Sequence, residues 1–185
     1  MEITILKICE NEYLNIKIKG ELSVNRKDVI LEQFLLCHNK NGWFVSFQSA
    51  VAGLTDEHAR WKRGDSENSI WEIVSHLVFW NERYLNRFKE IPIPEMEGDN
   101  DSTFANLNHL EWTSVADSFN AVMTDWYNTV RECEESKLDE HVNPESKHPW
   151  IETLTNITLH NAYHIGQIVT IRKMQGSWDK EQGVS

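Results

Sequence analysis

Apolar residues recur at helical spacing through most of the chain after its first 25 residues. Within residues 26–54, side chains on one helical face include Val29, Phe34, Leu35, Phe47 and Val51. Residues three or four apart lie on the same side of a helix, so the pattern predicts a helix over this range. Gly42 is a candidate interruption, because glycine costs about 1 kcal/mol relative to alanine inside a helix. Residues 55–65 are polar and predict a loop.

A second helix is predicted over residues 66–91. Ser66 or Ser69 could cap its start, since a serine side chain accepts hydrogen bonds from the first free backbone N–H groups of a helix. Pro92 follows its end, where proline cannot continue the backbone hydrogen bonding. Residues 91–110 are then polar and rich in turn formers, which predicts a long connection.

Two more helices follow this connection. One is predicted over residues 113–136, with apolar side chains along one side, and the other over 150–175, where Gly176 would stop it. Four long amphipathic helices in a chain of 185 residues favour an all-α fold, a four-helix bundle that we assign to residues 23–178.

The two ends of the chain differ from this helical pattern. Residues 1–22 are rich in β-branched side chains that partly alternate, in "ITILKI" and "YLNIKIK", with "CENE" between them as a turn. These features predict a short N-terminal β-hairpin extension. Residues 179–185 are polar, and we expect them to form a frayed tail.

Charge and cysteine content restrict the partners. The formal net charge is −11, and between residues 90 and 145 only Arg131 and Lys137 are basic. Acidic surfaces are repelled by phosphate backbones, which argues against nucleic-acid binding. The chain has neither a long apolar run nor a secretory leader, so we expect no membrane span and a cytoplasmic location. Cys9, Cys37 and Cys133 lack redox or zinc-ligand spacing and are expected to be inert thiols.

Two histidines in "TLHNAYHIGQ" suggest a metal site. His160 and His164 are four residues apart, so their rings project from one helical face, close to Ile157 and Ile168. Buried imidazoles need partners, and a divalent cation would serve both rings at once. Histidines stacked in the core or capping a helix are the alternative. Position 161 is Asn161, so the H-E-x-x-H protease motif is absent.

His76 adds a third imidazole on another helix. Its helical neighbours Ile73, Phe79 and Trp80 place it on an apolar stripe, where a histidine is either a satisfied core residue or a ligand. Three histidines from two facing helices can converge inside a bundle and leave coordination positions open, as in catalytic metal sites. The other five histidines lie in polar contexts and are expected to be exposed or capping residues: His38, His58, His109, His141 and His148.

"NSIWEIVSHLVFWNERYL" followed by "HNAYHIGQI" resembles the DinB-like superfamily, metal-binding four-helix bundles related to bacillithiol and mycothiol transferases. The resemblance covers about residues 26–176. It implies that His76, His160 and His164 bind one divalent metal per chain, zinc or nickel, with open water positions. It also implies a homodimer and a thiol S-transferase type of activity on a small molecule.

Helical spacing names further candidates around the three histidines. Gln167 and Asn156 lie one turn after His164 and one turn before His160, and either could orient a ligand, or be an ordinary helix amide. Glu72 could be a fourth ligand or general base, or simply an exposed glutamate. Trp71 and Trp80 could line an apolar pocket over the metal, or pack in the core.

Three functions remain open. A thiol S-transferase would use a low-molecular-weight thiol at the metal, a metal-dependent hydrolase would use a metal-bound water, and a non-catalytic protein would use the metal for stability. An anionic thiol needs basic groups nearby, but these form no cluster in the sequence: Arg83, Arg87, Arg172 and Lys173.

Overall fold

The computed structural model describes residues 25–64, 67–105 and 110–183, so the predicted hairpin in residues 1–22 and His109 lie outside it. Within these residues there are helices and no strand. The α-helices are α2 (Arg26–His38), α3 (Phe47–Val51), α4 (Asp56–Arg60), α5 (Ile70–Phe88), α6 (Trp112–Glu132) and α7 (Trp150–Met174). Three short 3₁₀ turns, η1 (Asp101–Phe104), η2 (Glu135–Asp139) and η3 (Lys180–Gln182), lie in the connections and the tail.

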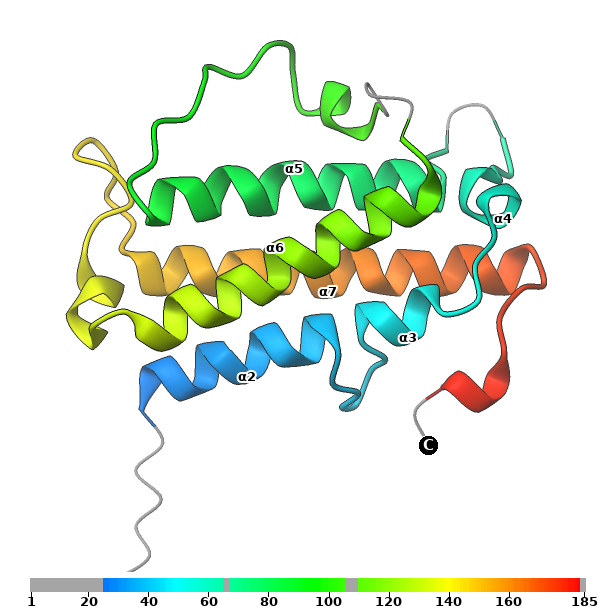
Figure 1. The fold of residues 1–185 in the computed structure, drawn as a ribbon, viewed down its shortest axis with the longest axis horizontal. Helices are drawn as coiled ribbons and strands as arrows, with labels where there is room; N and C mark the ends of the chain where they lie inside the picture. Colours follow the sequence, from blue (N-terminus) through cyan, green and yellow to red (C-terminus); the bar gives the residue numbers. More distant parts are fainter. Residues whose placement is uncertain (1–24, 65–66, 106–109, 184–185) are drawn as a thin grey trace, which may run out of the picture.

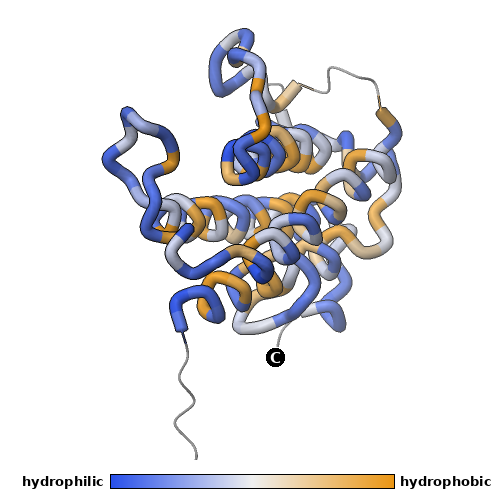
Figure 2. The backbone as a smooth tube through the Cα atoms, turned by 60° about the vertical axis from the view of Figure 1, so that its left-hand side comes forward, coloured by the Kyte–Doolittle hydropathy of each residue, from blue (hydrophilic) through white to orange (hydrophobic). Residues whose placement is uncertain are grey.

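The four long helices α2, α5, α6 and α7 form a bundle, which confirms the predicted fold class (Figure 1). Helix α6 packs against both α5 and α2, and α7 packs against the same two helices on the other side. The order around the bundle is therefore α2, α6, α5, α7. Helices α5 and α7 are neighbours that run in opposite directions (Figure 1). Buried hydrophobic residues come from all four long helices, and hydrophilic residues dominate the connecting loops (Figure 2).

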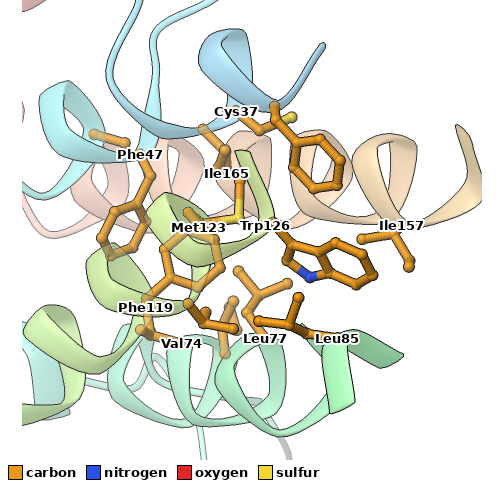
Figure 3. Packing of buried hydrophobic residues seen from close by; sticks show 14 of the residues in the cluster. Cys37, Phe47, Val74, Leu77, Leu85, Phe119, Met123, Trp126, Ile157 and Ile165 are labelled. Atoms are coloured by element: carbon orange, nitrogen blue, oxygen red, sulfur yellow. The ribbon is translucent and has the colours of Figure 1, made fainter. Parts of the chain in front are cut away.

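The core gathers around the inner face of α6. Phe119, Met123 and Trp126 are fully buried there, among side chains from all the other long helices and from α3 (Figure 3). Phe34 of α2 stacks on Trp126 with ring centroids 5.4 Å apart, and Phe47 of α3 contacts Phe119 at 4.3 Å. Burial of such aromatic side chains contributes about 1.5–3 kcal/mol each, so this cluster holds α5 and α7 in a fixed relation.

The first predicted helix is broken in the structure. Helix α2 ends at His38, and only the short α3 continues the helical pattern of the predicted range. At the break, a side chain on Gly42 would place its Cβ 2.6 Å from Cδ2 of Leu36, so the chain turns closely against α2 where only glycine fits without a shift. The prediction of one helix over residues 26–54 was therefore wrong, although Gly42 does lie at the interruption.

Two segments predicted as irregular contain short helices. Helix α4 lies in the predicted loop 55–65, and its start is capped by Thr55, whose side chain accepts a hydrogen bond from the N–H of His58. The turn η1 lies in the predicted connection 91–110. Both are shorter than two helical turns, too short for hydrophobic periodicity to show. Both η1 and α4 pack against α5.

The ends of the long helices follow from capping. At the start of α5, Ser69 and Glu72 form a reciprocal pair, in which the Ser69 side chain accepts from the Glu72 N–H and the Glu72 carboxylate accepts from the Ser69 N–H. Of the two candidate caps, Ser69 is the one used. Helix α7 ends before Gly176, whose φ of 77° is the left-handed conformation that glycine adopts most easily.

Buried Arg172 fixes the residues that follow α7. Its guanidinium donates to the carbonyls of Ala50 in α3 and Ser177 in the tail, at 2.8 and 2.7 Å. It also lies 5.3 Å from the ring centroid of Trp178. The predicted frayed tail thus includes the short turn η3. In the described residues, no helix combines the length and apolar character needed to cross a bilayer.

Candidate metal centre

Three histidines from two helices converge at one point in the bundle. His76 comes from α5, and His160 and His164 come from α7. The Nε2 atom of His160 lies 3.1 Å from Nε2 of His76 and 3.0 Å from Nε2 of His164. One nitrogen from each ring lies within 4.8 Å of the others. The i, i+4 spacing on α7 and the packing of α7 on α5 produce this arrangement.

Hydrogen bonds at the opposite ring atoms fix which nitrogen of His76 and His164 carries the proton. Nδ1 of His76 lies 2.6 Å from Oγ1 of Thr103, and this hydroxyl donates its own proton to the carbonyl of Asn100 at 2.6 Å. The hydroxyl must therefore accept from Nδ1–H of His76. Nδ1 of His164 lies 2.7 Å from the amide oxygen of Gln167, which can only accept. Both rings are thus protonated at Nδ1, and both Nε2 atoms present lone pairs.

This proton arrangement fits a bound cation. His160 has one N–H at most at its Nε2, so it can donate to only one of the two lone pairs that face it at about 3 Å. One of these two lone pairs would otherwise have no donor among the three rings. A divalent cation among the three Nε2 atoms would satisfy them together, and neutral imidazole is a common ligand for zinc and nickel.

The protonation behaviour of the three rings agrees with this donor set. Burial, followed by the nearby rings of His164 and His160, lowers the pKa of His76 to about 3. Burial and the ring of His164 lower the pKa of His160 to about 4. Burial also lowers the pKa of His164, against the opposing effect of its hydrogen bond with Gln167. The imidazoles are therefore neutral at pH 7, which is the form that binds metal.

Aromatic side chains cover two sides of the centre. The ring of Phe104, in η1, stacks on His76 with centroids 3.9 Å apart and planes 12° apart. Trp80, one turn after His76 on α5, meets the same imidazole edge-on at 6.5 Å. Sequence reasoning missed both Thr103 and Phe104. The available signal was weak: Phe104 is the one aromatic residue in the polar stretch 91–110.

A buried pair of asparagines lies beside the histidines. Asn81 of α5 and Asn161 of α7 are almost fully buried and exchange two amide hydrogen bonds, at 2.8 and 3.1 Å. Asn81 also donates to the carbonyl of Leu77, one turn earlier on α5. The reciprocal amide pair fixes the register of the two helices that carry the three imidazoles. Sequence reasoning missed this pair too.

An open pocket of about 480 Å³ leads to the centre. It lies between α5 and α7 and is also lined by Asn100 and by the loop before α7. His160 belongs both to this lining and to the group of three histidines, so the pocket reaches the centre at that ring. Its other lining residues are Trp80, Asn81, Tyr84, Arg87, Val142, Asn143, Ser146, His148, Thr153, Asn156 and Ile157. A small molecule in the pocket would contact His160 directly.

The structure places the remaining predicted residues in different surroundings. Gln167 contacts His164, and its own amide donates to the hydroxyl of Tyr163 at 3.0 Å. Asn156 is exposed and lines the pocket, but in the described part of the chain it makes no hydrogen bond to a histidine. Trp80 lines the pocket as expected.

Glu72 and Trp71 are not part of the centre. The Glu72 carboxylate binds the N–H of Ser69 at 2.7 Å and Nζ of Lys62 at 2.6 Å, which lowers its pKa despite the opposing effect of burial. Helix capping thus holds the carboxylate at the start of α5, away from the three histidines, and a role as fourth ligand or base remains a prediction. Trp71 is buried against Trp112, with Arg60 over its ring at 3.6 Å, and does not line the pocket.

The other described histidines lie away from the centre. His141 and His148 are exposed, as expected. His38 is buried, with Nε2 3.1 Å from Oδ1 of Asn120, and His58 is half-buried on α4. The prediction for His38 was wrong because the end of α2 packs against α6, a contact that local sequence does not reveal.

Fold and site together define a class: a four-helix bundle whose interior holds three convergent imidazoles that could bind a divalent metal. The family model of the DinB superfamily matches residues 45–168, and the chain belongs to this superfamily. A comparison with curated protein sequences finds no match.

One similar solved structure is YfiT from Bacillus subtilis, described as a probable metal-dependent hydrolase with an unusual four-helix bundle topology. The two chains share 16% sequence identity and superpose with a TM-score of 0.63. The similarity covers 86% of this chain and 94% of YfiT. At this identity the comparison supports the fold.

Proposed function

We propose that this chain is a divalent-metal-dependent enzyme of the thiol S-transferase type, with its metal held by His76, His160 and His164. The observation that carries this proposal is the convergence of three Nε2 atoms, two of them kept free of protons by Thr103 and Gln167. Three imidazole ligands leave coordination positions for an exchangeable molecule, and the pocket provides access at His160.

A divalent cation bound to these residues would supply a Lewis acid, which would favour the deprotonated form of a bound thiol and lower the pKa of a bound water to about 7. The protein's own contribution favours the thiol. The described lining of the pocket carries no carboxylate, its one imidazole besides His160 is the exposed His148, which binds Glu152, and Glu72 is engaged at the helix start. Hydrolysis of a stable bond gains from a positioned general acid or base, whereas a bound thiol needs no further base.

Hydrolysis is the second candidate, and the likeness to YfiT favours it. The two reactions place different demands on the pocket. A transferase must hold a thiol at the histidines and an electrophile beside it, while a hydrolase needs room for only one organic substrate. The pocket of about 480 Å³ is open to solvent and would accommodate two small molecules end to end.

Elemental analysis of tag-free protein is the first test. Near one equivalent of zinc or nickel in the wild type, lost in His76→Ala and in His160→Ala, is the expected result. Absence of metal after both ions are offered would overturn the proposal. A purely structural metal would instead resist exchange, and its loss would lower only thermal stability.

Cobalt substitution separates the two reactions. Addition of a small thiol such as 2-mercaptoethanol to the cobalt-loaded protein is expected to produce a sulfur-to-cobalt charge-transfer band in the near ultraviolet. An unchanged spectrum, together with turnover of an activated ester such as 4-nitrophenyl acetate, would favour the hydrolase. His164→Ala is the control, because it removes a ligand that does not line the pocket.

A homodimer is part of the same proposal. The outer face of α7 exposes Leu159, Tyr163 and Met174, with 61%, 63% and 53% of each residue accessible. Exposed apolar side chains on one helix are typical of an interface. Sedimentation equilibrium of the wild type beside Leu159→Glu tests this, and a monomer at all concentrations would contradict it.

A further inference from the structure

The pocket has two chemically distinct ends. His76, Trp80, Tyr84 and Arg87 follow one another on α5 at intervals of four, four and three residues, which places them on one face of the helix. The rise of a helix puts the Cα atoms of His76 and Arg87 about 16 Å apart along its axis. Along the α5 wall of the pocket, the end near His160 therefore lies by the metal centre, Trp80 and Tyr84 follow, and Arg87 lies at the far end.

The charge of the described pocket lining is opposite in sign to that of the chain. The protein carries 29 acidic side chains and a net charge of −11, yet no acidic residue appears in the described lining. Several carboxylates close in sequence to the lining residues bind other side chains. Glu90 and Glu140 both bind Lys137, and Glu152 binds the exposed ring of His148. Such an arrangement favours an anionic ligand over a cationic one.

Arg87 has unused hydrogen-bonding capacity. Its guanidinium lies 5.1 Å from the ring centroid of Tyr84, which holds the side chain along the pocket wall. In the described part of the chain it forms neither an ion pair nor a side-chain hydrogen bond, unlike Arg83 one turn earlier, which donates to the carbonyl of Pro94. A planar guanidinium with free donors matches the two oxygens of a carboxylate.

We propose that the pocket binds an elongated small-molecule carboxylate, with the carboxylate on Arg87 and the opposite end at the three histidines. The rings of Trp80 and Tyr84 would contact an apolar or aromatic middle section. Hydroxyl and amide groups of Thr153 and Asn156 line the pocket from α7 and would accept or donate hydrogen bonds without adding charge. One arginine without a neighbouring lysine in the lining suits a singly charged carboxylate better than a doubly charged phosphate.

This inference names a substrate class for the proposed function. It rests on that function only where it places one end of the ligand at the three histidines. Arg87 would bind a carboxylate whether or not a metal is present. The two proposals can therefore fail separately, provided that metal content and carboxylate recognition are measured on the same samples.

The test compares two probes that differ in one group, 6-phenylhexanoate and its neutral analogue 6-phenylhexanamide. Their dissociation constants are measured by ligand-observed NMR titration against wild type, Arg87→Gln, Arg83→Gln and His164→Ala. We expect the wild type to bind the carboxylate about 10-fold or more tighter than the amide, as a charge-assisted pair of hydrogen bonds would give. Arg87→Gln should lose this preference and bind the amide as before, while Arg83→Gln should keep it.

His164→Ala addresses the main competing explanation, in which the carboxylate binds the metal itself. Persistence of the preference in His164→Ala, which disrupts the metal site but not the described lining, supports the assignment to Arg87. Loss of the preference in His164→Ala with retention in Arg87→Gln would overturn it. Equal binding of the two probes by the wild type, or no binding of either, would also overturn it. Circular dichroism melts confirm that each variant is folded.

Discussion

Nδ1 of His76 and Oγ1 of Thr103 lie 2.6 Å apart, and the same hydroxyl is 2.6 Å from the carbonyl of Asn100. This chain of two hydrogen bonds orients the imidazole and decides which of its nitrogens keeps the proton. The 3₁₀ turn η1 thus determines the ligand properties of a histidine in α5, although 27 residues separate the two side chains.

Removing the Thr103 hydroxyl should weaken metal binding without unfolding the bundle. Thr103→Val keeps the shape of the side chain but not its acceptor, so the His76 ring can rotate or change tautomer. Loss of such an outer hydrogen bond costs about 10–100-fold in metal affinity. Competition with a chelator measures the affinity. Thr124→Val is the matched control, because the Thr124 hydroxyl bonds only within α6. Equal affinity in the two variants would show that Thr103 does not orient His76.

The asparagine pair should show strong coupling between α5 and α7. Either Asn81→Leu or Asn161→Leu leaves the other amide buried and unsatisfied, which costs about 1–3 kcal/mol of unfolding free energy. The double variant replaces both amides by apolar groups, and its cost should be clearly smaller than the sum of the two single costs. Urea unfolding of metal-free protein measures all four species. Additive effects would mean that the amides contribute to stability independently.

Buried His38 should make stability depend on pH. Burial lowers its pKa in the folded protein, although the hydrogen bond with Asn120 opposes this, while an unfolded histidine has a pKa of about 6.5. Above this value both states are neutral and His38 adds no pH dependence. As the pH falls below it, the unfolded chain binds the proton first, so the unfolding free energy decreases.

His38→Gln retains a side-chain donor toward Asn120 but cannot titrate. Between about pH 7.5 and about pH 5 the wild type should therefore lose more unfolding free energy than this variant does. Metal release affects both proteins alike, so the difference between them isolates His38. His141→Gln, at an exposed position, should behave like the wild type. Parallel curves for wild type and His38→Gln would refute this account.

The sequence predicted those parts of the fold that depend on local patterns of residues. The apolar stripe of α5, the cap at Ser69 and the stop at Gly176 are local signals, and each appears in the structure at the expected place. The break after His38 was only partly visible, because the contact of Gly42 with Leu36 depends on how the chain turns back.

In the site too, local patterns predicted some residues and not others. His160 and His164 could be placed on one face from their spacing alone, and His76 from the apolar stripe around it. Thr103 and Asn161 could not be found, because their partners lie on other elements and a threonine or asparagine carries no sign of its partner. Contacts between elements distant in sequence become visible only when the helices are packed.

Variants at Glu72 can distinguish a structural role of this residue from a catalytic one. Its carboxylate accepts from the Ser69 N–H and binds Lys62, so Glu72→Gln keeps an acceptor for the cap and loses only charge. The expected cost is about 0.3–1 kcal/mol of unfolding free energy, because the lost charge lies near a helix N-terminus and its ion pair is partly exposed. Metal content and turnover should remain at the wild-type level. A general base would behave differently, since its removal slows turnover by about 10²–10⁴-fold.

Ser69→Ala is the companion variant: it breaks the cap from the other side and should lower stability by about 1 kcal/mol, again with unchanged metal content. Calorimetry, elemental analysis and turnover on the same three samples decide the matter, and a selective loss of turnover in Glu72→Gln would return Glu72 to the chemistry of the site.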